Sequence, residues 1–194
     1  MSEERIPLTE QADACDADCG GGTFDRRGFL FASGASVVSV LLPGSTGISM
    51  QAQQVNYPRA NIGNVTQLRV GQAVPFSYPW DHANCRNLLI NLGQSAAGGV
   101  GPNRSIVAFN TLCTHMGRRM QADKFHAETG VAGPCTWHWT TFDLTRHGMV
   151  VSGHATEGLP QILLELDGNN IIATGVMGLL YGFHNNRINP NNEE

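Results

Sequence analysis

The feature that most constrains this chain is a pair of short motifs that each offer one thiol and one imidazole. The first motif places Cys113 two residues before His115, and the second places Cys135 three residues before His138. Thiolates and imidazoles are the usual protein ligands of zinc and of iron centres. Because the two motifs supply the same pair of ligand types, we expect their loops to meet at one metal site.

Two cysteines and two histidines suit a two-iron centre in which the cysteines hold one iron and the histidines hold the other. Two loops that each bring one ligand of both types can clamp such a [2Fe–2S] cluster between them. Three other interpretations use the same residues: a mononuclear zinc site, a disulfide between Cys113 and Cys135, and a catalytic pair of one cysteine with one histidine. The duplication of the motif favours the two-iron centre.

Composition indicates one compact, β-rich domain with appendages. Of the 194 residues, 41% are hydrophobic and only 14% are charged, and 23 are glycine. Glycine supplies backbone angles that tight turns require, so we expect many turns and little helix. The net charge of −4 provides no basic surface, and nucleic acid is therefore not an expected partner.

Short apolar runs alternate with turn-forming clusters from residue 56 onward, which predicts strands. The predicted strands cover residues 67–70, 73–78, 87–92, 105–109, 149–152, 161–166 and 170–174. The Asp-Gly dipeptide at 167–168 predicts a hairpin, and a ragged helical pattern is confined to residues 116–127. The predicted fold class is all-β, a small sandwich of antiparallel strands.

The N-terminal region carries an expected export signal. Arg26 and Arg27 stand before an apolar stretch of small residues at 29–43, which is typical of a twin-arginine signal. The stretch is shorter than the roughly 20 residues of a membrane-spanning helix, so we expect membrane contact at most through an uncleaved signal. Twin-arginine export carries folded proteins with their cofactors, which predicts a periplasmic protein loaded before export.

The stretch from about residue 104 to 176 resembles a Rieske domain. The Cys-Thr-His-Met-Gly loop, the Thr-Phe-Asp after the second loop and the Gly-Val-Met-Gly-Leu-Leu-Tyr-Gly at 175–182 resemble the small subunit of arsenite oxidase. The small subunit of iodate reductase is closely similar. This resemblance implies one Rieske-type [2Fe–2S] cluster per chain, held by Cys113, His115, Cys135 and His138.

The resemblance also implies a function and partners. We expect a non-catalytic electron-transfer subunit that links a large molybdopterin catalytic subunit to a periplasmic cytochrome c or a similar carrier. Arsenite oxidase is the first expectation; iodate reductase, with electrons flowing inward, and a stand-alone exported ferredoxin are the alternatives. The implied organisation is an N-terminal region at 1–54 and a Rieske-type antiparallel β-sandwich at 55–194, with an inserted cluster-binding subdomain at about 110–155.

Four positions near the ligands bear on how the resemblance is read. The common Rieske pattern has a disulfide between the two loops, and its two cysteine positions are Arg118 and Trp137 in this chain. A serine that donates to a bridging sulfide corresponds to Thr140, and a tyrosine that donates to a ligand thiolate corresponds to Phe142. The resemblance therefore implies loops without a cross-link and, because one donor to sulfur is lost, a reduction potential in the lower or middle part of the Rieske range.

The other histidines and cysteines have no metal-ligand spacing. The histidines at 82, 126, 147, 154 and 184 are expected to have surface or structural roles. Cys85 is expected to be buried as a small apolar residue. Cys15 and Cys19 lack further ligands nearby and are expected to be inert.

Overall fold

A computed structural model describes residues 56–187 and 189–192 of the chain. The arginine pair at 26 and 27, the cysteines at 15 and 19 and the predicted boundary at residue 54 lie outside this part. The signal, its export route and its processing stay predictions.

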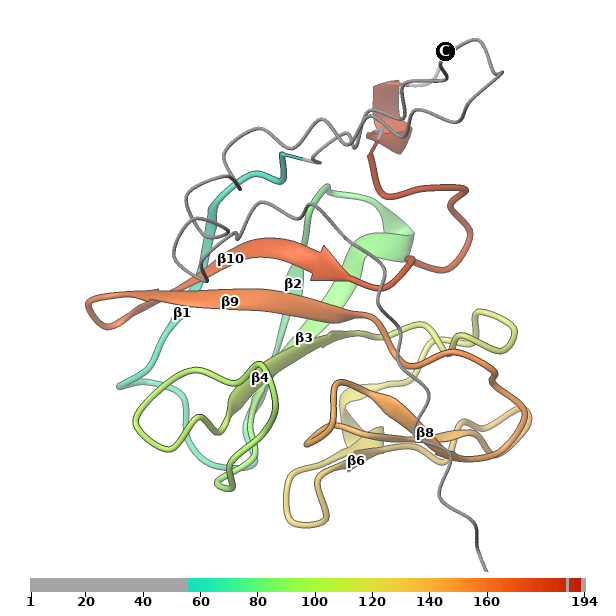
Figure 1. The fold of residues 1–194 in the computed structure, drawn as a ribbon, viewed down its shortest axis with the longest axis horizontal. Coiled ribbons are helices and arrows are strands. Elements are labelled where there is room, and N and C mark those ends of the chain that lie inside the picture. Colours follow the sequence, from blue (N-terminus) through green and yellow to red (C-terminus); the bar gives the residue numbers. More distant parts are fainter. Residues whose placement is uncertain (1–55, 188, 193–194) are drawn as a thin grey trace, which may run out of the picture. The chain divides into compact units, whose positions relative to one another are not determined.

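Ten strands in the described part form two antiparallel sheets, and no α-helix is found there (Figure 1). The larger sheet has the order β1-β10-β9-β4-β3-β2, and its strands are β1 (Ala60–Asn64), β2 (Ala73–Ser77), β3 (Arg86–Asn91), β4 (Ile106–Asn110), β9 (Gln161–Asp167) and β10 (Asn170–Met177). The smaller sheet has the order β5-β6-β7-β8, and its strands are β5 (Phe125–His126), β6 (Val131–Ala132), β7 (Thr141–Asp143) and β8 (Met149–Ser152). The all-β prediction is confirmed. No helix among the described residues is long and apolar enough to cross a membrane.

The central strands of the larger sheet divide the core in two because successive side chains point to opposite faces. In β3, Leu88 and Ile90 join one buried cluster, whereas Leu89 joins the other. In β4, Phe109 belongs to the first cluster and Ala108 to the second. A strand buried on both faces reads as a continuous apolar run, which is how these strands stand out in the sequence.

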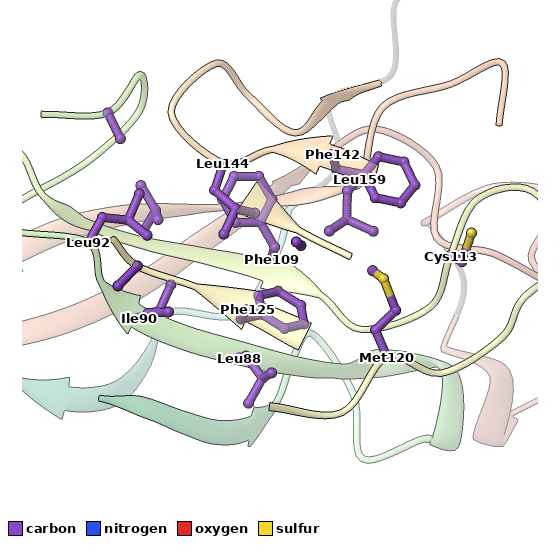
Figure 2. Packing of buried hydrophobic residues seen from close by; sticks show 14 of the residues in the cluster. Leu88, Ile90, Leu92, Phe109, Cys113, Met120, Phe125, Phe142, Leu144 and Leu159 are labelled. Carbon is purple, nitrogen blue, oxygen red and sulfur yellow. The ribbon is translucent and has the colours of Figure 1, made fainter. Parts of the chain in front are cut away.

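The first core connects the larger sheet to the metal-ligand loops. It contains Phe109 from β4 and Phe142 from β7, and it also contains Cys113 and Cys135. Figure 2 shows Leu92 and Ile90 toward one end of this cluster, with Cys113 and Met120 toward the other. The two predicted ligand cysteines are therefore anchored in the same apolar core that joins the two sheets.

All four strands of the smaller sheet fall between β4 and β9 in the chain. These two flanking strands are themselves neighbours in the larger sheet, where Ala108 pairs with Ile162 and Phe109 with Gln161. The chain thus leaves the larger sheet after Asn110, builds the smaller sheet and returns at Gln161. The two loops that carry the predicted ligands lie within this excursion.

The hairpin prediction is confirmed, and one strand prediction is wrong. Strands β9 and β10 pair as a hairpin in which Gly168 has a φ of +58°. Residues 67–70 form no strand, and only Val70 makes an isolated bridge, to Asn91. The reason is local: the Asn64 side chain accepts hydrogen bonds from the backbone N–H and the hydroxyl of Thr66, which turns the chain there.

The ragged helical pattern at 116–127 does not form an α-helix. It contains a single 3-10 turn, Ala122–Lys124, followed directly by β5. Met116 is 51% exposed, whereas Met120 and Phe125 are buried, so the apolar residues do not share one helical face. The sequence analysis also missed β1 and the short strands β5 to β7, whose two to five residues give too little periodicity.

Candidate metal centre

Two loops with the same backbone frame carry the four predicted ligands. The first loop, residues 113–117, follows β4, and the second loop, residues 135–139, connects β6 to β7. In the first loop the carbonyl of Cys113 accepts a hydrogen bond from the N–H four residues later, at 2.8 Å, and the Cys113 N–H donates to the carbonyl five residues later, at 2.9 Å. In the second loop the corresponding bonds of Cys135 measure 3.0 and 2.8 Å.

The fifth residue of each loop has a left-handed backbone. It is Gly117 in the first loop, with a φ of +71°, and Trp139 in the second, with a φ of +62°. Glycine adopts this conformation without a steric penalty, whereas a residue with a side chain rarely does. The shared geometry shows that the two loops turn in the same way around their ligands.

The loops bring like ligands together. The Nδ1 atoms of His115 and His138 lie 3.1 Å apart, and the two ring planes are nearly perpendicular, at 89°. The thiols of Cys113 and Cys135 are close enough to hydrogen-bond with each other. The sulfur pair is buried, and the imidazole pair is partly exposed. One end of the site thus offers two thiolates to a metal and the other offers two imidazoles.

This donor set fits a [2Fe–2S] cluster with two sulfur-ligated and two nitrogen-ligated positions. Burial raises the pKa of the Cys113 thiol, and a metal ion bound there would favour the thiolate that ligates it. Partial burial and the neighbouring imidazoles of His138 and His154 lower the pKa of His115, which favours the neutral ring that binds a metal. In the structure Cys113 and Cys135 form no disulfide with each other.

Thr140 connects the second loop to the ligand thiols. Its side chain is fully buried, and its hydroxyl oxygen accepts hydrogen bonds from the N–H groups of His154 and Ala155 at 3.2 and 3.4 Å. With these acceptor positions filled, the hydroxyl hydrogen is free to donate to the sulfur of Cys113, with which Thr140 is in hydrogen-bond contact. The predicted role of Thr140 as a donor to the cluster is compatible with this geometry.

Phe142 lies in the buried core, whereas Arg118 is exposed and joins the two loops. Phe142 is fully buried in the first core, with Leu144 and Leu159 in the same cluster (Figure 2). Arg118 lies directly after the first loop and contacts the second: its guanidinium carbon is 5.4 Å from the ring centroid of Trp137, and its Nε donates to Thr136 Oγ1 at 3.3 Å. Arg118 and Trp137 therefore touch across the two loops.

His154 is a residue at the site that the sequence analysis missed. Its ring stacks on His115 with a centroid separation of 5.5 Å and an interplanar angle of 27°, and it lies 6.1 Å from the ring of His138. It stands two residues after β8, far from both motifs in the sequence, and spacing alone could not reveal it. The preceding residue, Gly153, has a φ of +99° and packs against Thr140. This glycine is the sequence signal that could have placed the segment after β8 next to the site.

Three other histidines make the structural contacts that were expected. His82 accepts a hydrogen bond from the N–H of Asn84. His126 is 3.1 Å from the carbonyl oxygen of Gly133, and His147 is 2.7 Å from Gln161 Oε1. Cys85 is buried, as expected, and burial raises the pKa of its thiol.

The C-terminal segment supports the first loop. The ring of Tyr181 packs so closely on Gly117 that any side chain there would collide with it. In the same loop, the Thr114 hydroxyl donates to the Glu157 carbonyl at 2.7 Å. The first loop is thus fixed by both the C-terminal segment and the connection between β8 and β9.

Comparisons with known proteins agree with this arrangement. Residues 87–163 match the Rieske [2Fe–2S] domain. Iodate reductase subunit IdrB of Denitromonas iodatirespirans is 50% identical over 162 residues, which cover 84% of this chain and 86% of that subunit. Subunit IdrB of Pseudomonas sp. (strain SCT) is 46% identical over 187 residues, covering 94% and 95%. The soluble domain of Rieske protein II (soxF) from Sulfolobus acidocaldarius shares the fold, with a TM-score of 0.58 at 23% identity over 70% of this chain and 86% of that one.

The matched domain defines the class of this protein as a Rieske [2Fe–2S] protein. Within that class, the identity along most of both chains shows that it belongs to the family of iodate reductase subunit IdrB. The cofactor implied by the domain is a Rieske-type cluster, so the zinc and catalytic-pair interpretations are set aside.

The contact between Thr140 and Cys113 predicts a change in potential. A hydrogen bond to sulfur stabilises the more negative, reduced cluster, so Thr140→Val should lower the reduction potential. The expected shift is some tens of millivolts. A bond of this kind is worth about 1.5–3 kcal/mol at most, and only the difference between its strengths in the two oxidation states changes the potential. Thr140→Ser keeps the hydroxyl and should stay near the wild-type value. A redox titration followed by absorbance measures both variants, and an unchanged potential in a fully loaded Thr140→Val variant would show that this hydroxyl does not act on the cluster.

Proposed function

We propose that this chain is the electron-transfer subunit of a periplasmic iodate reductase, and that it passes electrons from a cytochrome c or a similar carrier to a large molybdopterin catalytic subunit. The observation that carries the proposal is the 50% identity to an iodate reductase subunit over most of both chains. This favours the iodate reductase alternative over the arsenite oxidase that stood first in the sequence analysis. Reduction of iodate consumes electrons, so they would enter the complex through this chain.

The ligands in this proposal are the four residues that the sequence predicted. Cys113 and Cys135 would hold the inner iron, and His115 and His138 the outer one. When bound, the cluster supplies a one-electron redox couple. The chain buries the thiol pair in its first core and leaves the imidazole pair partly exposed, which lets a partner's redox centre approach the histidine side.

The surroundings of the ligands support a transfer role rather than a catalytic one. A cavity of about 620 Å³ opens in the described part of the chain, and its lining includes Pro75, His82, Arg86 and Arg119. None of the four ligand residues lines it. The four candidate ligands therefore do not belong to this cavity, which supports chemistry on another subunit.

Metal analysis tests the ligand assignment. The full-length chain, purified after export, should contain about two irons and two acid-labile sulfides. His115→Ala and His138→Ala should each abolish the electron paramagnetic resonance (EPR) signal of the reduced cluster, because each removes one ligand from the outer iron. His184→Ala, which changes an exposed histidine, is the matched control and should keep the signal. One zinc per chain without iron would contradict the assignment.

The direction of electron flow is tested on the complex of this chain with its catalytic subunit. The complex is reduced with dithionite, desalted and mixed with iodate, which should reoxidise the cluster and remove its EPR signal. The oxidised complex mixed with arsenite should stay oxidised. The isolated chain under the same conditions controls for direct oxidation by iodate. Reduction of the cluster by arsenite, with no response to iodate, would instead support the arsenite oxidase interpretation.

The export proposal rests on the arginine pair of the N-terminal region. Replacing both Arg26 and Arg27 with lysine should leave the protein in the cytoplasm, because the twin-arginine pathway reads the guanidinium pair. Arg5→Lys changes an arginine in the same region and should not affect export. Immunoblots of periplasmic and cytoplasmic fractions measure the distribution, and normal export of the double variant would refute a twin-arginine signal.

A further inference from the structure

A cation–π contact joins the two ligand loops. The Arg118 guanidinium lies over the ring of Trp137 with 5.4 Å between its central carbon and the ring centroid. The same side chain donates from Nε to the hydroxyl of Thr136 at 3.3 Å. Arg118 follows the first loop, whereas Thr136 and Trp137 belong to the second, so one side chain holds both loops.

Arg118 forms no ion pair with the described acidic residues. The ion pairs in this part of the chain involve Arg59, Arg86, Lys124, His126 and Arg146 instead. A guanidinium without a carboxylate partner gains from the negative face of an indole, and arginine stacks on such a face with its planar group. Trp137 is 50% exposed, and besides this cation its ring meets the ring of His138 edge-on, with 6.3 Å between the ring centroids.

The contact between Arg118 and Trp137 adds to the shared core and the Thr140 contact, which hold the two loops together near the thiols. Each loop closes its own pair of backbone hydrogen bonds around its cysteine, which fixes its internal shape but not its separation from the other loop. That separation sets the distance between the thiols and between the imidazoles. A contact between Arg118 and Trp137 constrains it directly, because each residue lies within three residues of a ligand.

We propose that Arg118 and Trp137 form a non-covalent clamp that fixes the separation of the two loops and slows the loss of the cluster. The inference rests on the proposed ligand set. In the resemblance described above, these are the positions where the common Rieske pattern has its disulfide, so the clamp would take the place of that cross-link. Both are positioning residues, because they act on the cluster through the loops that carry its ligands.

Trp139 provides a matched control within the same loop. It is also an indole, it is 70% exposed, and it is two residues from Trp137. In the described part of the chain, no cation lies over its ring. A substitution at Trp139 therefore removes a comparable exposed surface without removing the clamp.

The test is a double-mutant cycle on the rate of cluster loss from the full-length, loaded chain. Loss is followed by the bleaching of cluster absorbance in excess chelator. Arg118→Ala and Trp137→Leu should each accelerate it about 2- to 5-fold, the range that an exposed cation–π contact implies. The double variant should be no faster than the faster single variant, because the second change has no contact left to remove. Arg118→Lys should recover part of the loss, since it keeps a cation.

A parallel cycle with Trp139→Leu serves as the control. Arg118→Ala and Trp139→Leu should multiply their effects, since the two side chains share no contact. If Arg118→Ala and Trp137→Leu also multiply, or if neither changes the rate, the clamp is refuted. The same variants report on geometry: loss of the clamp should broaden the EPR spectrum of the reduced cluster, because the imidazole positions become less uniform.

A covalent link in place of the cation–π contact tests the clamp even if the single variants do not load the cluster. The double variant Arg118→Cys and Trp137→Cys should form a disulfide on mild oxidation, and it should then lose its cluster no faster than wild type. After selective reduction of that bond, loss should be as fast as in Arg118→Ala. A fully loaded oxidised variant that still loses its cluster quickly would refute the clamp. Wild-type protein without iron would instead refute the proposed function, so the two failures are distinguishable.

Discussion

The convergence of four ligands depends on a pair of backbone hydrogen bonds that each loop closes around its own cysteine. In both loops the cysteine carbonyl accepts from the fifth residue and the cysteine N–H donates to the residue after it. This frame directs the thiol inward and the histidine toward the surface. Because both loops have the same frame, sulfur meets sulfur and the Nδ1 of His115 meets that of His138 at 3.1 Å. Because both loops repeat this frame, the two thiols lie together at one end of the site and the two imidazoles at the other.

The surrounding structure fixes the position of the two short loops relative to the sheets. Cys113 and Cys135 belong to the core that Phe109 of β4 and Phe142 of β7 also share, so the larger and smaller sheets both fix the sulfur end. Thr140 satisfies two backbone N–H groups and contacts a ligand thiol with the same hydroxyl. Removal of buried polar partners is costly, and these hydrogen bonds therefore tie the conformation of the β8–β9 connection to the state of the site.

The sequence could single out the four candidate ligands because each motif is local: a cysteine and a histidine stand two or three residues apart. Strands β3 and β4 were equally visible, since burial on both faces leaves a continuous apolar run. His154 could not be found in this way, because its stacking on His115 depends on where β8 ends in three dimensions. The contact of Arg118 with Trp137 is also a product of the fold. The false strand at 67–70 arose from apolar residues whose conformation is decided by the Asn64 side chain.

The connection between β4 and β9 gives the chain a modular character. All four candidate ligands, together with Thr140 and His154, come from one uninterrupted stretch, residues 111–160, whose two ends are held side by side where Phe109 pairs with Gln161. Strand β1 lies at the far edge of the larger sheet, where it pairs only with β10. The candidate redox centre is thus encoded by one continuous segment, whose two ends meet at neighbouring strands of the larger sheet.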